Sequence, residues 1–170
     1  MKVYIASMFS DKDRVLARAG ELADLGIECT SRWAAEAVPH NTTLKDCTEE
    51  YLRETAVADV QDILRADAVV LTVPDAEMLV NVTMAAASRG GRTFESGLVY
   101  GLILAEALDG GKPSRELIIL GKKENVFHYL DGIGVTKIYP AITVLPTWDA
   151  VKAYLSLRAS GWNAMSVMHV

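Results

Sequence analysis

The sequence predicts an α/β domain in which a parallel β-sheet is covered on both faces by helices. Short apolar or β-branched runs alternate with longer amphipathic segments along the chain, which is the order typical of such a sheet. The runs at 68–73 and 116–121 are almost entirely apolar, as expected of strands that are buried on both faces. Hydrophobic residues make up 51% of the 170 residues and charged residues 23%, which fits one globular domain spanning 1–170.

Local signals mark the ends of the expected elements. Gly26 is expected to stop the first helix, Pro74 ends the apolar run before it, and Gly110 and Gly111 follow a long apolar helix. Thr147 stands where an N-cap side chain would begin the last helix. In chain order, we expect strands at 2–6, 27–33, 68–73 and 116–121, a last strand at 137–140 or 141–145, helices at 11–26, 48–67, 96–112 and 147–159, and a helical turn at 125–130, with 75–92 left unassigned.

Composition and spacing exclude several classes of function. The net charge of −5 argues against a nucleic-acid partner, and no apolar stretch reaches the roughly 20 residues of a membrane span. The chain starts directly with a strand pattern and without a charged-then-apolar leader, so we expect a cytoplasmic protein. Cys29 and Cys47 lack metal or redox spacing and are expected to be reduced thiols, with a disulfide as the alternative. The histidines fit no metal-ligand pattern, and no G-x-G-x-x-G follows the first strand, so we expect neither metal nor cofactor.

Ligands of an open parallel sheet bind beyond the carboxyl ends of its strands. Three loops follow such ends here, namely 7–12, 74–92 and 121–127. We therefore search these loops for the binding site and include Ser7, the first residue of the first loop, among the candidate substrate-binding residues.

Glu95 is the first candidate for chemistry. It lies in SRGGRTFESG (88–97), which we expect to place it in the first turn of a largely apolar helix. Unpaired backbone N–H groups at a helix N-terminus stabilise a charged carboxylate, and Arg89 and Arg92 add to that effect. We therefore expect Glu95 to be ionised at neutral pH and suited to act as a nucleophile or to stabilise a developing cation. The alternative is a plain capping glutamate.

The segment before Glu95 is a candidate anion site. Two glycines leave backbone N–H groups accessible, and two arginines add guanidinium forks, which together suit a phosphate. The alternative is a solvated surface loop. The candidate substrate-binding residues here are Ser88, Arg89, Gly90, Gly91 and Arg92.

Asp59 is the second candidate for chemistry. On a helix over 48–67 it lies within the apolar stripe, about 20° from Leu52 and about 40° from Ile63. A buried carboxylate is costly unless it has a partner or lines a cavity, so we expect a site residue or a structural hydrogen bond to a neighbouring loop. Asp62 lies on the flank of the stripe, where we expect it to be solvated or in a salt bridge, and we add it to the substrate-binding candidates. The stripe consists of Leu52, Ala56, Val60 and Ile63.

Two carboxylates in different environments suit the cleavage of a glycosidic bond. One attacks or stabilises the oxocarbenium-like sugar, and the other handles the proton of the leaving group. Tyr4 on the first strand is expected to be core, with a hydroxyl that holds a carboxylate if it opens onto the same cleft.

Five motifs resemble those of the nucleoside 2-deoxyribosyltransferase family, especially its shorter bacterial and phage members. They are KVYIAS at 2–7, SRW at 31–33, ADVQDILRADAVVLTV at 58–73, SRGGRTFESGLVYG at 88–101 and GKKENVFHYL at 121–130, in the family's order. The resemblance implies a flavodoxin-like (Rossmann-like) three-layer sandwich with a mostly parallel five-stranded sheet. It also implies cleavage of the N-glycosidic bond of a nucleoside or nucleotide, and a homodimer or larger homo-oligomer with shared active sites.

The resemblance also assigns roles to single residues. Glu95 matches the family's nucleophile, Asp59 its helix aspartate near the departing base or sugar, and Tyr4 the tyrosine that orients the nucleophile. The candidates for base contacts are Phe9 and Trp33, and the candidate for contact with a neighbouring subunit's sugar is Asn125.

The segment before Glu95 departs from the family pattern. A second cleft aspartate of the longer transferases has no match, and the arginine-bearing glycine segment is more similar to the branch that hydrolyses 5′-phosphorylated nucleotides. Transfer or hydrolysis, and nucleoside or nucleotide, are therefore both left open. Two other functions are alternatives: a non-catalytic nucleotide-binding module, and an oligomerisation domain that uses the apolar tail at 161–170.

Overall fold

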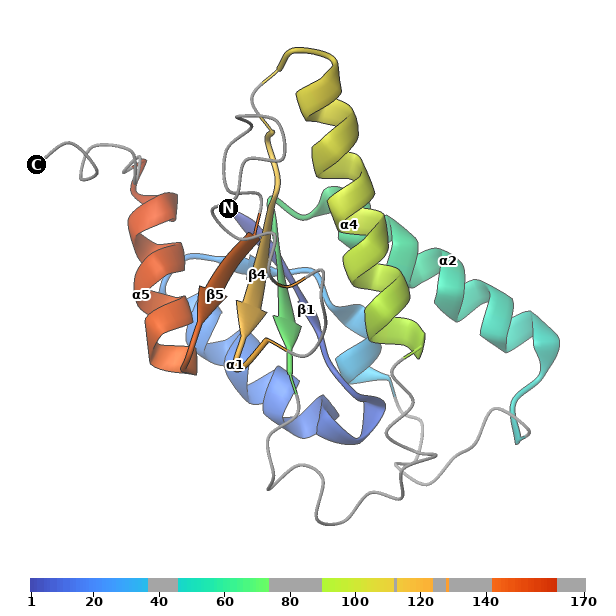
Figure 1. Ribbon diagram of the computed structural model, residues 1–170. Coiled ribbons are helices and arrows are strands. Elements are labelled where there is room, and N and C mark those ends of the chain that lie inside the picture. The colour runs from blue at the N-terminus through green and yellow to red at the C-terminus, as the bar shows by residue number, and fades with distance from the viewer. Residues whose placement is uncertain (37–45, 74–89, 112, 124–127, 129–141, 162–170) are drawn as a thin grey trace, which may run out of the picture.

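A single parallel sheet forms the centre of the protein (Figure 1). The computed structural model describes residues 1–36, 46–73, 90–111, 113–123, 128 and 142–161. Within them, five strands pair in the order β2-β1-β3-β4-β5, and every pairing is parallel. This confirms the predicted α/β class and five-stranded sheet. The strands are β1 (Lys2–Ala6), β2 (Glu28–Cys29), β3 (Ala68–Thr72), β4 (Glu116–Leu120) and β5 (Ile142–Leu145).

Helices cover both faces of the sheet, which gives three layers (Figure 1). One face carries α1 (Lys12–Asp24) and α5 (Trp148–Ala159), and the other carries α2 (Glu49–Arg65) and α4 (Gly90–Leu108). Two short 3-10 helices follow the first two strands, η1 (Phe9–Asp11) and η2 (Arg32–Ala35).

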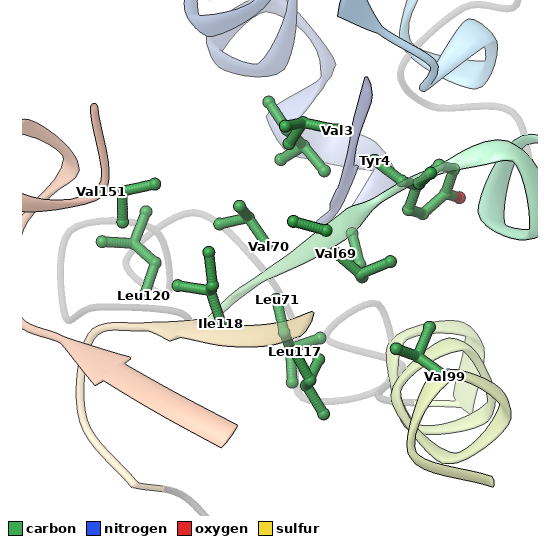
Figure 2. Close-up of a cluster of buried hydrophobic side chains, with 14 of the residues drawn as sticks. Val3, Tyr4, Val69, Val70, Leu71, Val99, Leu117, Ile118, Leu120 and Val151 are labelled. Carbon is green, nitrogen blue, oxygen red and sulfur yellow. The ribbon is translucent and has the colours of Figure 1, made fainter. Parts of the chain in front are cut away.

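The core consists of side chains that alternate between the two faces of the sheet. Figure 2 shows Val69 and Leu117 on the side of Val99 from α4, whereas Val70 and Ile118 lie on the side of Val151 from α5. Every residue of β3 is buried, as expected of a strand in which all residues but Thr72 are apolar. Burial of this apolar surface is the main driving force that holds the helices against the sheet.

Several predicted helix ends are confirmed. Gly26 and Gly110 have φ values of 71° and 77°, the left-handed conformation that glycine adopts without steric cost after a helix. The Thr147 side chain accepts a hydrogen bond from the Ala150 N–H at 3.2 Å and caps α5. Thr48 caps α2 in the same way.

Two predicted elements differ from the structure. The strand expected at 27–33 is only Glu28–Cys29, because the Thr30 and Ser31 side chains bond to the backbone of β1 and the chain then turns into η2. The helix expected at 96–112 is longer at its start, since α4 already includes Gly90. The segments 75–89, 125–127, 129–130 and 137–140 lie outside the described residues.

No helix in the described part of the chain is long and apolar enough to cross a membrane. Cys29 and Cys47, both described, form no disulfide with each other.

Candidate active site

A hydrogen bond between β1 and α4 forms the centre of the candidate site. The Tyr4 hydroxyl donates to Oε1 of Glu95 at 2.6 Å. The Tyr4 ring is completely buried and lies on the α4 side of the sheet, the side of Val99 (Figure 2). This confirms the expectation that the tyrosine hydroxyl holds a carboxylate.

The proton in this bond belongs to the tyrosine. Burial raises the pKa of Tyr4 far above its ordinary value, and the nearby carboxylates of Glu95 and Asp59 raise it further. Tyr4 is therefore a permanent donor that holds one oxygen of Glu95 in place.

The groups that act on the pKa of Glu95 differ from those predicted from the sequence. Glu95 is the sixth residue of α4, beyond its first turn, so the prediction that the helix N-terminus ionises it is wrong. Burial instead raises the pKa of Glu95, while the Tyr4 hydrogen bond and the charge of Arg92 lower it. Two protein groups thus counter the cost of burying this carboxylate.

Arg92 lies inside the protein and not in a solvated loop. Its side chain is buried, and Nη1 donates to the carbonyl oxygen of Thr72, the last residue of β3, at 2.8 Å. Gly90 and Gly91 are helical residues of α4, so 90–92 is not the solvated surface loop considered as the alternative. Ser88 and Arg89 lie outside the described residues.

Asp59 is a half-buried carboxylate on α2. Within the described ranges it forms no hydrogen bond or ion pair, so the structural hydrogen bond considered above is absent there. Burial raises its pKa to about 7, and the charges of Glu95, Glu36 and Asp62 act in the same direction. A carboxyl group with this pKa exchanges its proton near neutral pH, which is what general acid–base catalysis requires.

Helix packing brings the two carboxyl groups together. α2 and α4 contact each other, and both contact β1, the strand of Tyr4. The charge of Glu95 acts on Asp59, and the charges of both act on Tyr4. The negative charge of Glu95 therefore disfavours ionisation of Asp59.

Asp62 is tied to the segment that follows β2. Its side chain is completely buried, and Nε of Arg32 donates to its two oxygens at 2.9 and 3.0 Å. The predicted salt bridge is therefore confirmed, and the expectation of a solvated Asp62 is wrong. Ala56, expected within the apolar stripe, is exposed, because α2 turns that side to solvent.

Glu36 is a further carboxylate of the site that the sequence does not single out. It follows η2, and its Oε2 accepts a hydrogen bond from the Tyr51 hydroxyl of α2 at 2.5 Å. Its charge raises the pKa of Asp59. The available signal is a row of polar side chains along α2, in which Tyr51, Thr55 and Asp59 follow each other at intervals of four residues.

The predicted base-contacting residues lie together. The Phe9 and Trp33 rings are 6.4 Å apart between centroids, with their planes at 37°. The Trp33 indole N–H donates to the Ile5 carbonyl oxygen at 3.2 Å, so only the ring carbons of this buried side chain are left for contacts. The Ser7 hydroxyl donates to Asp11 at 2.8 Å and shapes the turn after β1. Asn125 lies outside the described residues.

A hollow of about 380 Å³ lies elsewhere, between α1 and α5. It is lined in part by Glu21 and Lys152, which are paired with each other. It lies on the face of the sheet that carries α1 and α5, whereas α4, the helix of Glu95, covers the other face (Figure 1). Among the described residues, no group of three or more histidine, cysteine or acidic side chains is arranged to hold a metal ion.

Comparison with solved structures identifies proteins of similar fold. A 2-deoxyribosyltransferase from the psychrotolerant bacterium Bacillus psychrosaccharolyticus matches with a TM-score of 0.54 and 17% identity, over 91% of this chain and 92% of that one. A conserved protein from Enterococcus faecalis V583 matches with a TM-score of 0.50 and 12% identity, over 93% of this chain and 98% of that one. No protein-family model and no curated protein matches the chain. The protein thus has the fold of a 2-deoxyribosyltransferase, as its motifs predict.

The Tyr4–Glu95 bond predicts the effect of removing one hydroxyl. In Tyr4→Phe, Glu95 loses the donor that favours its charged form, so its pKa should rise. A pH titration of the Glu95 carboxyl carbon by NMR measures this change. Tyr154→Phe is the matched control, because Tyr154 on α5 also donates its hydroxyl hydrogen bond to a glutamate, Glu116 on β4, at 2.7 Å. A Glu95 pKa that stays constant or falls in Tyr4→Phe would contradict the assignment.

Proposed function

We propose that the protein cleaves the N-glycosidic bond of a (deoxy)nucleoside or its 5′-monophosphate and passes the sugar to another base or to water. One observation carries this proposal: a tyrosine hydroxyl holds Glu95, whose charge acts on Asp59, a carboxyl group that forms no hydrogen bond or ion pair among the described residues and whose pKa is raised to about 7. The fold shared with a 2-deoxyribosyltransferase supports it.

In the first step, Glu95 attacks C1′ of the sugar. Tyr4 holds Oε1, which leaves Oε2 to form the bond to carbon. The C1′–N bond breaks, and its electron pair goes to the base nitrogen. Protonated Asp59 supplies the proton, so the base departs neutral and the sugar is left as an ester of Glu95.

In the second step, a new base or water attacks C1′ from the face that the first base left. Ionised Asp59 takes the proton of this nucleophile, and the ester bond breaks to release the Glu95 carboxylate. The pair returns to its starting state with one proton. Both steps use the same two groups in opposite directions, and no cofactor takes part.

The charges of Glu95 and Asp59 suit these two reaction steps. The pKa of Asp59 is about 7 in part because Glu95 is negative, so ionised Glu95 keeps its neighbour protonated. Tyr4 and Arg92 favour the ionised form of Glu95. The Phe9 and Trp33 rings offer apolar faces for a base, and Arg92 supplies positive charge near the site.

The substrate class is tested by product analysis. The protein is incubated with mixed nucleosides and 5′-monophosphates, with and without a free acceptor base, and products are separated by chromatography. New nucleosides indicate transfer, while free sugar or sugar phosphate indicates hydrolysis. Glu95→Gln should reduce the rate at least about 1,000-fold, because an amide does not replace the nucleophile.

Glu106→Gln is a matched control, because Glu106 lies on the same helix and pairs with Arg115. It should keep its activity. No release of base from any substrate, or equal activity of the Glu95→Gln variant and the unchanged protein, would refute the proposed function.

The pair also predicts a bell-shaped pH profile of kcat/KM. Glu95 must be ionised, so activity is lost as the pH falls through its pKa. Asp59 must be protonated for the first step, so activity is lost as the pH rises through about 7. In Asp59→Asn the alkaline limb should disappear along with most of the rate. An alkaline limb that persists unchanged in this variant would show that another group supplies the proton.

We infer that a second copy of the chain packs on α4, next to Glu95. An exposed seam of five residues follows this helix at intervals of three and four, the spacing of helices that pair along one seam. Phe94, which directly precedes Glu95, is 62% exposed, and Leu108 is 78% exposed. The seam consists of Phe94, Gly97, Gly101, Leu104 and Leu108.

Gly101→Leu tests this assembly. Gly101 is exposed, and no described atom outside the local helix lies within 4 Å of a Cβ added there, so a leucine should be tolerated by the single chain and should stabilise the helix by about 1 kcal/mol. The same side chain should block close packing of two α4 helices, and light scattering should then show a monomer. Gly20→Leu in α1 is the control, since a Cβ there also meets nothing. A monomeric unchanged protein would contradict the inferred contact.

A further inference from the structure

Arg32 and Asp62 form an attachment between η2 and α2, an ion pair in which the Asp62 side chain is completely buried and the Arg32 side chain is 57% exposed. Nε of Arg32 donates to both oxygens of Asp62, at 2.9 and 3.0 Å, and its backbone N–H donates to Oδ2 at 3.2 Å. The Thr30 hydroxyl donates to the Asp62 carbonyl oxygen at 3.0 Å. One residue of α2 is thus held through its side chain and its backbone.

Arg32 contacts both ends of the turn of α2 that carries Asp59. Nη2 of Arg32 donates to the Ala58 carbonyl oxygen at 3.4 Å, while its Nε bonds to Asp62. Asp59 directly follows Ala58 and lies three residues before Asp62, so the guanidinium group spans the helical turn between them. A change in this contact would move the Asp59 carboxyl group with the turn.

A carboxylate buried as completely as Asp62 is costly unless it is paired and hydrogen-bonded. A hydrophobic residue at this position would avoid that cost, so stability alone does not account for the Asp62 carboxylate. The guanidinium is the donor suited to this position, because its planar fork fixes distance and angle together.

We propose that Arg32 and Asp62 are positioning residues, which hold the turn of α2 so that the Asp59 carboxyl group stays beside Glu95. The proposal rests on the proposed function, and it assigns Asp62 to positioning in place of the substrate contact expected from the sequence.

The two residues also act on the proton of Asp59 in opposite directions. The charge of Arg32 lowers the pKa of Asp59 and that of Asp62 raises it. The other groups that face Asp59 are Glu95 on α4 and Glu36 after η2, which raise its pKa, and Tyr4 on β1, which is neutral. Removing the charge of Arg32 and removing that of Asp62 should therefore shift the pKa of Asp59 in opposite directions.

The test compares Arg32→Gln with Asp62→Asn by two readouts, kcat and an NMR titration of the Asp59 carboxyl carbon. We expect kcat to fall at least about 10-fold in both, because small displacements of a reacting group are costly. The pKa of Asp59 should rise in Arg32→Gln and fall in Asp62→Asn. Arg53→Gln is the control, since Arg53 is exposed on the same helix and forms no hydrogen bond or ion pair within the described ranges. It should change neither readout.

Arg32→Lys separates position from charge and covers the case in which Asp62→Asn does not fold. Lysine keeps the charge but lacks the planar fork, so kcat should fall while the Asp59 pKa stays near its original value. Equal kcat in Arg32→Lys and the unchanged protein, or pKa shifts of the same sign in Arg32→Gln and Asp62→Asn, would overturn the proposal. If the protein cleaves no nucleoside, the proposed function fails, while the titrations still decide whether the pair controls Asp59.

Discussion

The hydrogen bond from Tyr4 to Glu95 is the interaction on which the candidate site depends. It joins β1, an inner strand of the sheet, to α4 through the Tyr4 side chain, which is completely buried. Because the tyrosine keeps its proton, the bond fixes one oxygen of Glu95. The sheet thus sets the position of the carboxylate to which the proposed function assigns the reaction, as a precise active site would require.

The proposed function also requires a proton source, a role that it assigns to Asp59 on α2. Asp59 lacks a bonded partner within the described ranges, so burial and neighbouring charges alone determine its pKa of about 7. Three residues further along α2, Asp62 is held by Arg32 from η2. In the proposals above, one helix therefore carries both the proton donor and the attachment that positions it.

The sequence predicts the sheet, most helix ends and the three central side chains, because apolar periodicity, the Thr147 cap and the family motifs are local signals. It does not predict how α4 starts, since a glycine pair suits a loop and a helix start alike. The burial of Asp62 depends on Arg32, which lies 30 residues away in sequence. The contribution of Glu36 likewise arises only where η2 meets α2.

The central claim is that Glu95 becomes covalently bonded to the sugar. Rapid acid quenching during turnover of a cleaved nucleoside, followed by mass spectrometry of peptides, tests it directly. The account predicts a mass increase of one sugar unit on the peptide that contains Glu95, and no such increase in Glu95→Gln. Full turnover without any adduct on Glu95, or an adduct on another residue, would contradict it.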